Sequence, residues 1–271
     1  MFTETFNALI KEAQFTKEML GSGATQIRNA NYAAKGVYFQ AFTSLSTGLE
    51  RIGKLCLMLD HFIDHNGQFP DFNYMKNEIG HKIGVIYEKS LVVASKRSIS
   101  MQFLRKLDDP IHQAILRILA EFAQGDRYSN IDLIVGAKRQ SDPIASWFTQ
   151  VDIPLYATRV SRNKKEAIDG NATAIAAMLA PHAMVRHTSE TGDEITDVED
   201  ASRRTGMQTA VAPFRQLYVL QVIRYWVELL SSLQYTAMQT GSEDIPFFSE
   251  VFAPFYNDDS YIRTRKTWDT V

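Results

Sequence analysis

Histidines and their polar neighbours are the side chains of this sequence best suited to chemistry. His61 and His65 lie four residues apart, a spacing that places two imidazoles on one helix face, as a zinc site requires. The glutamate that follows the first histidine in the hydrolytic zinc motif is absent, because Phe62 stands there. Histidines also favour the negative end of a helix dipole. We therefore interpret the pair as the end of a long helix and expect no metal site.

Two further polar groups stand beside predicted helices. His81 lies next to, but not on, an apolar helical line, and we expect it to hydrogen-bond to the backbone or to Glu50, with a ligand contact as the alternative. Arg127, Asn130 and Asp132 follow a predicted helix break. Polar groups of this kind pair with one another or cap helix ends, or they face a ligand pocket, since loops often carry function.

Two long amphipathic helices are predicted to position these groups. The first spans residues 32–65, and its apolar residues recur at steps of four and three: Tyr38, Phe42, Leu45, Leu49, Ile52, Cys56, Leu59 and Ile63. The second spans residues 213–238. One continuous apolar stripe must pack against other helices. The pattern therefore predicts an all-α, multi-helix bundle.

Shorter elements are predicted between and around these helices. A first helix over 2–20 is expected to end at Gly21-Ser22-Gly23, and Asp71 is expected to cap a third. Others should start at Asp109-Pro110, ending at Gly125-Asp126, and at Asp142-Pro143, with an Ala-rich helix over 171–183. Thr191-Gly192-Asp193 indicates a small β-hairpin within 184–198, or an exposed loop. The tail from Ile245 should form an irregular surface cap.

Composition limits the class of protein. The chain has 271 residues, 45% of them apolar, which is enough for a buried core. No apolar run approaches the roughly 20 residues of a membrane span, and the N-terminus does not resemble a secretory signal. A single cysteine cannot form an internal disulfide. We therefore predict a cytoplasmic protein that does not contact membranes.

Charge and motif content narrow the function classes further. A net charge of −2 gives no global case for nucleic-acid binding, and the local basic clusters at 96–106 and 159–165 are interpreted as solvated loop charges. The sequence contains no phosphate-cradling glycine loop, dinucleotide fingerprint or nucleophile elbow. No cofactor is expected.

The sequence of the first predicted long helix resembles that of a known family. The run Tyr38-Phe39-Gln40-Ala41-Phe42 leads to Glu50-Arg51-Ile52-Gly53-Lys54-Leu55, and Ile79-Gly80-His81-Lys82-Ile83 follows one helix later. This resembles HEPN-type helical domains, which show a Glu-x-x-x-Lys-Leu step and then a Gly-His or Ser-His pair. The resemblance covers roughly residues 1–130. It divides the chain into a HEPN-like bundle (1–155) and a helical extension (156–271) that should form one continuous unit with it.

The resemblance implies a catalytic pair. Active members carry an Arg and a His separated by four to six residues near a helix start at a dimer interface. Here Arg105 and His112 are the only pair with that spacing. The histidine would shuttle the proton of an RNA 2′-hydroxyl, and the arginine would hold the scissile phosphate. The sequence departs from the family pattern in two ways, because Lys106 follows the arginine and Pro110 separates the partners.

Two functions follow from the resemblance as expectations. The first is a metal-independent endoribonuclease of a phage-defence or toxin–antitoxin system, with an antitoxin as partner protein. A homodimer would bring Arg105 and His112 together, while Arg127, Asn130, Asp132 and His81 would contact RNA or a ligand. The second is a catalytically silent helical module that dimerises or binds a partner protein.

Overall fold

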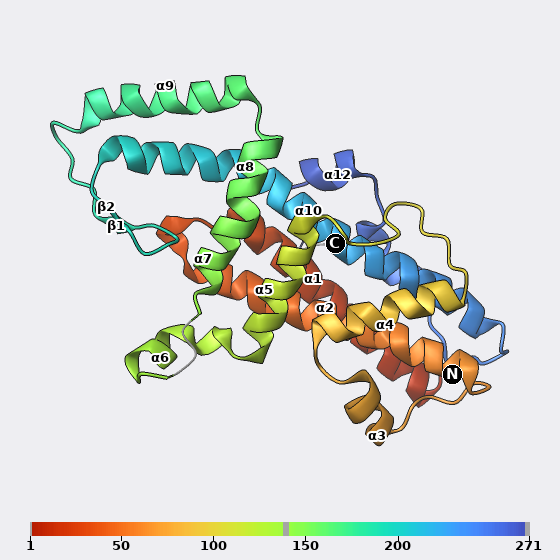
Figure 1. Cartoon of the computed structure of the whole chain (residues 1–271). Helices are drawn as coiled ribbons and strands as arrows, with labels where there is room; N and C mark the ends of the chain where they lie inside the picture. Colours follow the sequence, from red (N-terminus) through yellow and green to blue (C-terminus); the bar gives the residue numbers. More distant parts are fainter. Residues whose placement is uncertain (1, 138–140, 269–271) are drawn as a thin grey trace.

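The computed structural model describes residues 2–137 and 141–268 and is all-α with one small hairpin (Figure 1). The α-helices are α1 (Glu4–Asn29), α2 (Gly36–Asp64), α3 (Phe72–Tyr74), α4 (Ile83–Lys96), α5 (Pro110–Gln124), α6 (Ser129–Ile134), α7 (Pro143–Trp147), α8 (Ile153–Arg159), α9 (Arg162–Leu179), α10 (Val198–Met238), α11 (Phe248–Val251) and α12 (Asp259–Thr264). The strands are β1 (His187–Thr188) and β2 (Glu194–Ile195). Single helical turns are η1 (Tyr32–Ala34), η2 (Met75–Ile79), η3 (Asp126–Tyr128), η4 (Phe148–Asp152) and η5 (Ala253–Phe255). The predicted fold class is confirmed.

Helices α1 and α2 form the pair on which the rest is built. A Cβ added at Gly23 would lie 2.6 Å from Leu45 Cγ, and one added at Gly48 would lie 2.7 Å from Leu20 Cδ2. The glycines therefore let the two backbones approach closely. The predicted end of the first helix at Gly21-Ser22-Gly23 is wrong, because this packing overrides the low helix propensity of glycine. The predicted start of the second helix at Tyr32 is also wrong, since Tyr32 lies in η1 and α2 begins at Gly36.

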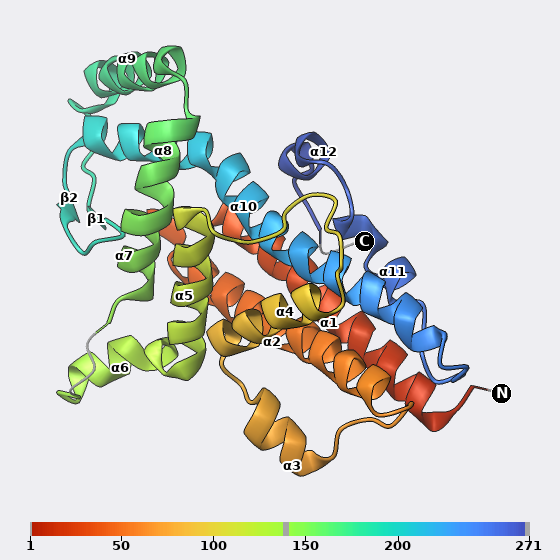
Figure 2. The ribbon, with the colours of Figure 1, turned by 45° about the vertical axis from the view of Figure 1, so that its right-hand side comes forward.

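Helix α10 is the longest element and crosses the molecule (Figures 1 and 2). Its C-terminal part packs along α1 and α2, and its N-terminal part extends beyond them beside α9. The predicted start at Pro213 is wrong, because Pro213 lies inside the helix, which begins at Val198 behind the N-cap Asp197. A proline can stand inside a helix where the backbone bends, at the cost of one helical hydrogen bond.

Several predicted helix boundaries are confirmed. Asp109 accepts a hydrogen bond from the backbone of Ile111 at the start of α5, and the helix ends at Gly125. Asp142 caps α7 in the same way. Asp71 caps α3, but the single third helix predicted there is wrong, because Gly80, at φ 70°, separates η2 from α4. The Ala-rich helix is present as α9, which starts earlier than expected, at Arg162.

The C-terminal half supplies the hairpin and much of the core. Strands β1 and β2 pair antiparallel, with His187 opposite Ile195, so the predicted hairpin is confirmed. The prediction of an irregular surface tail is wrong. The tail forms α11, η5 and α12, and it buries four large aromatic residues, Phe248, Phe252, Phe255 and Trp268. Aromatic burial anchors a segment that has no helical period of its own.

One hydrophobic core takes residues from both sides of position 155. It includes Phe42 and Leu45 of α2, Ile115 of α5 and Trp226 of α10. The division into a 1–155 bundle and a 156–271 extension stays a prediction. Among the described residues, no helix combines the length and the apolar character that crossing a bilayer demands.

Candidate anion-binding groove

The residues that carry the family resemblance meet in one contact. His81 Nδ1 lies 2.9 Å from Glu50 Oε1 and 2.9 Å from Lys54 Nζ, and Lys54 also donates to Glu50 at 2.7 Å. Glu50 and Lys54 are one turn apart on α2, whereas His81 follows the positive φ of Gly80. Of the two partners expected for His81, the backbone or Glu50, the structure shows Glu50. When Nδ1 accepts from Lys54, the other ring nitrogen, Nε2, carries the proton and can donate.

This contact borders a groove of about 540 Å³. Three segments line the groove: α2, the turn before α4, and the end of α5 with η3. The lining residues are Thr43, Ser46, Thr47, Glu50, His81, Lys82, Phe122, Ala123, Gln124 and Arg127. Two residues predicted as ligand contacts from separate parts of the sequence, His81 and Arg127, therefore share one groove.

The groove has an excess of positive charge. Among its described lining residues Glu50 is the acidic one, and Lys54 neutralises that carboxylate. Neither Lys82 nor Arg127 forms an ion pair within the part of the chain that the structure describes. Both cations are thus available to an anion, together with the hydroxyl group of Thr47, which also lines the groove. Cations and hydroxyl donors are the groups that bind phosphate oxygens.

Arg127 is held at the groove by the end of α5. Its Nη2 donates to the carbonyl of Ala123 at 2.7 Å, and the guanidinium lies 5.7 Å from the ring centre of Tyr128. The remaining N–H groups of the guanidinium can reach a ligand, since arginine carries five donors. Asn130 is exposed and Asp132 half-buried on α6, and neither lines the groove. A ligand role for these two residues stays a prediction.

His112 is enclosed within the protein. Its side chain is buried on α5, where Nε2 lies 2.8 Å from Gln221 Oε1 and the ring packs against Tyr218. Burial lowers the pKa of His112, although the hydrogen bond to Gln221 and nearby aspartates oppose the shift. These contacts favour a neutral, structural imidazole.

Arg105 lies outside this environment. It is exposed in the connection between α4 and α5. Tyr218 instead contacts a different arginine, since Arg159 donates to its hydroxyl group and the same oxygen contacts Asp109. Catalysis by Arg105 and His112 stays a prediction, and in a single chain only 4% of His112 is exposed.

The histidine pair at the end of α2 makes local contacts. His65 is the C-cap residue, its Nδ1 lies 2.8 Å from the carbonyl oxygen of His61, and the ring of His61 stacks on Tyr74. The predicted helix end is confirmed. Within residues 2–137 and 141–268, no group of three His, Cys, Asp or Glu side chains is placed to hold a metal ion.

Two sets of polar residues were missed from the sequence. Lys82 lines the groove. It directly follows the Gly80-His81 pair in the sequence, and this position could have identified it as a candidate ligand contact. The second set is a buried cluster in which Arg215 lies 3.4 Å from Asp152 and donates to Tyr38. Its members come from α2, η4 and α10, so no sequence spacing marks them. Comparison of the chain with protein-family models, with curated proteins and with solved structures gave no match.

Proposed function

We propose that this protein is a cytoplasmic, HEPN-like RNA-binding protein that holds the RNA backbone in the groove between α2 and α5. One observation carries the proposal: His81, Lys82 and Arg127 line the same groove, and the two cations have no ion-pair partner among the described residues. Phosphate contacts supply most of the affinity in nucleic-acid binding. Hydroxyl groups such as that of Thr47 also suit the ribose 2′-hydroxyl.

The enclosure of His112 favours binding without cleavage. A general base must lie within hydrogen-bond reach of the proton that it removes, and Nε2 of His112 is occupied by Gln221. We therefore expect labelled RNA to stay intact with the wild-type protein in the absence of divalent metal. If the wild type cleaves the RNA and His112→Ala does not, the predicted catalytic role of His112 would be supported and binding without cleavage would be contradicted.

Binding of labelled single-stranded RNA, measured by fluorescence anisotropy, tests the groove. The double variant Lys82→Ala/Arg127→Ala should lose about tenfold or more in affinity, since each tenfold step needs only about 1.4 kcal/mol. The matched control is Lys164→Ala/Arg186→Ala. It removes one exposed lysine and one exposed arginine from other parts of the chain, with no ion pair at either among the described residues. Equal affinities for the two double variants would contradict the proposal, provided that circular dichroism shows both are folded.

A helical interaction module is the second candidate function, and α6 favours it. Four apolar side chains on and just after α6 are largely exposed, namely Ile131, Leu133, Ile134 and Val135. An exposed apolar patch of this kind marks an interaction surface. We expect a homodimer that buries it. Sedimentation should show a dimer for the wild type and a monomer for Ile134→Glu, whereas a monomeric wild type would exclude self-association through α6.

A further inference from the structure

A second cavity, of about 610 Å³, lies where the end of α1 meets α10. Its walls come from Arg28 and the turn that follows α1, from Thr205 to Pro213 on α10, and from Lys266 in the tail. The volume is in the range of small-molecule sites. Neither the sequence motifs nor the proposed RNA groove involves these residues.

The described lining residues of the cavity include two cations and no carboxylate. Arg28 and Lys266 are its charged lining residues. Among the residues that the structure describes, Arg28 donates to neutral acceptors, Gln216 Oε1 at 2.6 Å and the carbonyl of Arg263 at 3.0 Å. Burial lowers the pKa of Arg28, because the guanidinium loses part of its hydration. Lys266 is exposed and forms no ion pair within the described ranges. An anionic group placed between the two would neutralise both.

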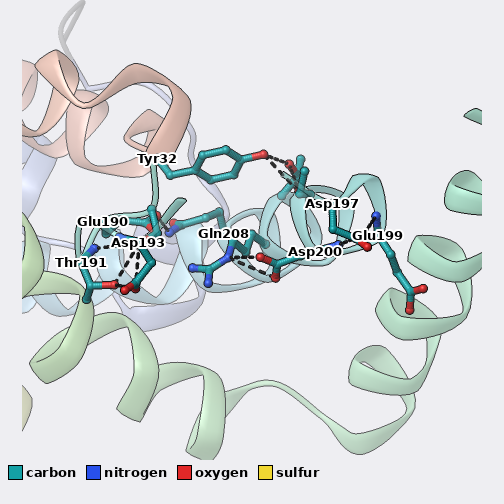
Figure 3. Close-up of polar contacts among 12 residues, drawn as sticks. Tyr32, Glu190, Thr191, Asp193, Asp197, Glu199, Asp200 and Gln208 are labelled. Carbon is teal, nitrogen blue, oxygen red and sulfur yellow. Dashed lines mark hydrogen bonds and ion pairs between the residues drawn. The ribbon is translucent and has the colours of Figure 1, made fainter. Parts of the chain in front are cut away.

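Gln208 lines the cavity with an amide group whose orientation is fixed. Gln208 is buried on α10; its carboxamide oxygen accepts from Arg215, and its nitrogen donates to Glu190. Because both ends of the amide are held, its orientation at the cavity is set before any ligand arrives. Tyr32 is fixed beside it, with its hydroxyl bonded to α10 at Ala201 and Thr205 (Figure 3).

The proline of α10 adds an acceptor to the same wall. Pro213 has no N–H, so the carbonyl of Thr209, four residues earlier, lacks its helical hydrogen bond. Thr209 and Pro213 both line the cavity. A carbonyl of this kind can accept from a hydroxyl group of a ligand. Cations from α1 and the tail, with acceptors from α10, suit a molecule with a phosphate and hydroxyl groups.

We propose that this cavity binds a small phosphomonoester, with the phosphate held by Arg28 and Lys266 and its hydroxyl groups directed to Gln208 and Thr209. Sugar phosphates and nucleoside monophosphates share this chemistry. The site is separate from the RNA groove, and its residues differ throughout.

Isothermal titration calorimetry of the full chain tests the site with four probes: ribose 5-phosphate, adenosine monophosphate, inorganic phosphate and ribose. Binding of ribose 5-phosphate stronger than that of phosphate or ribose would identify a sugar-phosphate site. Stronger binding of the nucleotide would show that the base contributes. If neither phosphomonoester binds at millimolar concentration, or if ribose binds as well as they do, the proposal is overturned.

Charge variants locate the site. Lys266→Ala should weaken phosphomonoester binding by about tenfold, and Lys164→Ala should leave it unchanged. Because Lys266 is exposed, its removal should not disturb folding, which the unfolding temperature checks. The Lys82→Ala/Arg127→Ala variant separates the two sites. It should keep the phosphomonoester affinity, and a loss there with no effect of Lys266→Ala would move the ligand to the RNA groove.

Discussion

At the scale of single residues, the contacts of each histidine define its role. His81 is exposed and meets a glutamate and a lysine, so one ring nitrogen is free to bind a ligand. His112 is buried against Gln221 and Tyr218, whose side chains come from α10, more than 100 residues away in the sequence. The place of His81 beside an apolar helical line predicted a bond to the backbone or to Glu50. The sequence could not predict the environment of His112, because that contact is long-range and depends on how α5 and α10 pack.

The burial of His112 predicts a pH dependence of stability. Its pKa is lowered in the folded state, so the unfolded chain binds more protons between that pKa and about 6.5. The free energy of unfolding should therefore fall as the pH drops from 7 through this window. His112→Gln should lose less stability than the wild type over the same drop, as measured by guanidinium denaturation at pH 7 and pH 5.5.

The comparison between variants matters because another buried group titrates in the opposite direction. Burial raises the pKa of Asp152 to about 6, against the attraction of Arg215. A raised carboxyl pKa weakens the folded state as the pH rises from about 4 to about 6. That contribution is common to the wild type and His112→Gln, so it cancels in their difference. An identical loss of stability in both proteins would contradict a neutral, buried His112.

At the scale of elements, local signals set the bounds of α5 and the start of α7, whereas packing between helices decides how far α1 and α10 extend. Asp109-Pro110 and Gly125 predicted the bounds of α5, since capping and termination are local. The helix end predicted at Gly21-Ser22-Gly23 and the helix start predicted at Pro213 are wrong, because packing between helices decides these boundaries and the local sequence does not. Glycine and proline break isolated helices, yet here a close helix contact accommodates the glycines, and the long α10, which changes direction along its length (Figure 1), contains the proline.

Two glycine substitutions should have opposite effects, because Gly23 lies in the α1–α2 contact and Gly170 of α9 has open space beside it. Gly23→Ala would force a Cβ to within 2.6 Å of Leu45 Cγ and 3.1 Å of the Leu45 backbone nitrogen, so it should cost about 1–3 kcal/mol. Gly170→Ala on α9 meets nothing within 4 Å and should stabilise the protein by roughly 0.5–1 kcal/mol through helix propensity. Chemical denaturation of both variants measures the two free energies of unfolding, and a stabilising Gly23→Ala would contradict the close approach.

At the scale of the whole molecule, the groove joins parts of the chain that no single motif spans. Residues of α2, the turn before α4, and the end of α5 contribute to it. The bundle and its two main helices were predictable, because apolar periodicity is a strong signal. The presence of His81 and Arg127 in one groove was not predictable, since it depends on which helices pack against each other. A binding role needs only this surface, whereas a ribonuclease would also need His112 to reach its substrate.

The salt dependence of RNA binding tests the central claim most directly. The logarithm of the affinity should fall linearly with the logarithm of the salt concentration, with a slope of about −0.7 for each neutralised phosphate of a single strand. If Lys82 and Arg127 each contact one phosphate, Lys82→Ala/Arg127→Ala should flatten the slope by about 1.4. Lys164→Ala/Arg186→Ala should keep the wild-type slope. Parallel lines for the wild type and the groove variant would contradict the account.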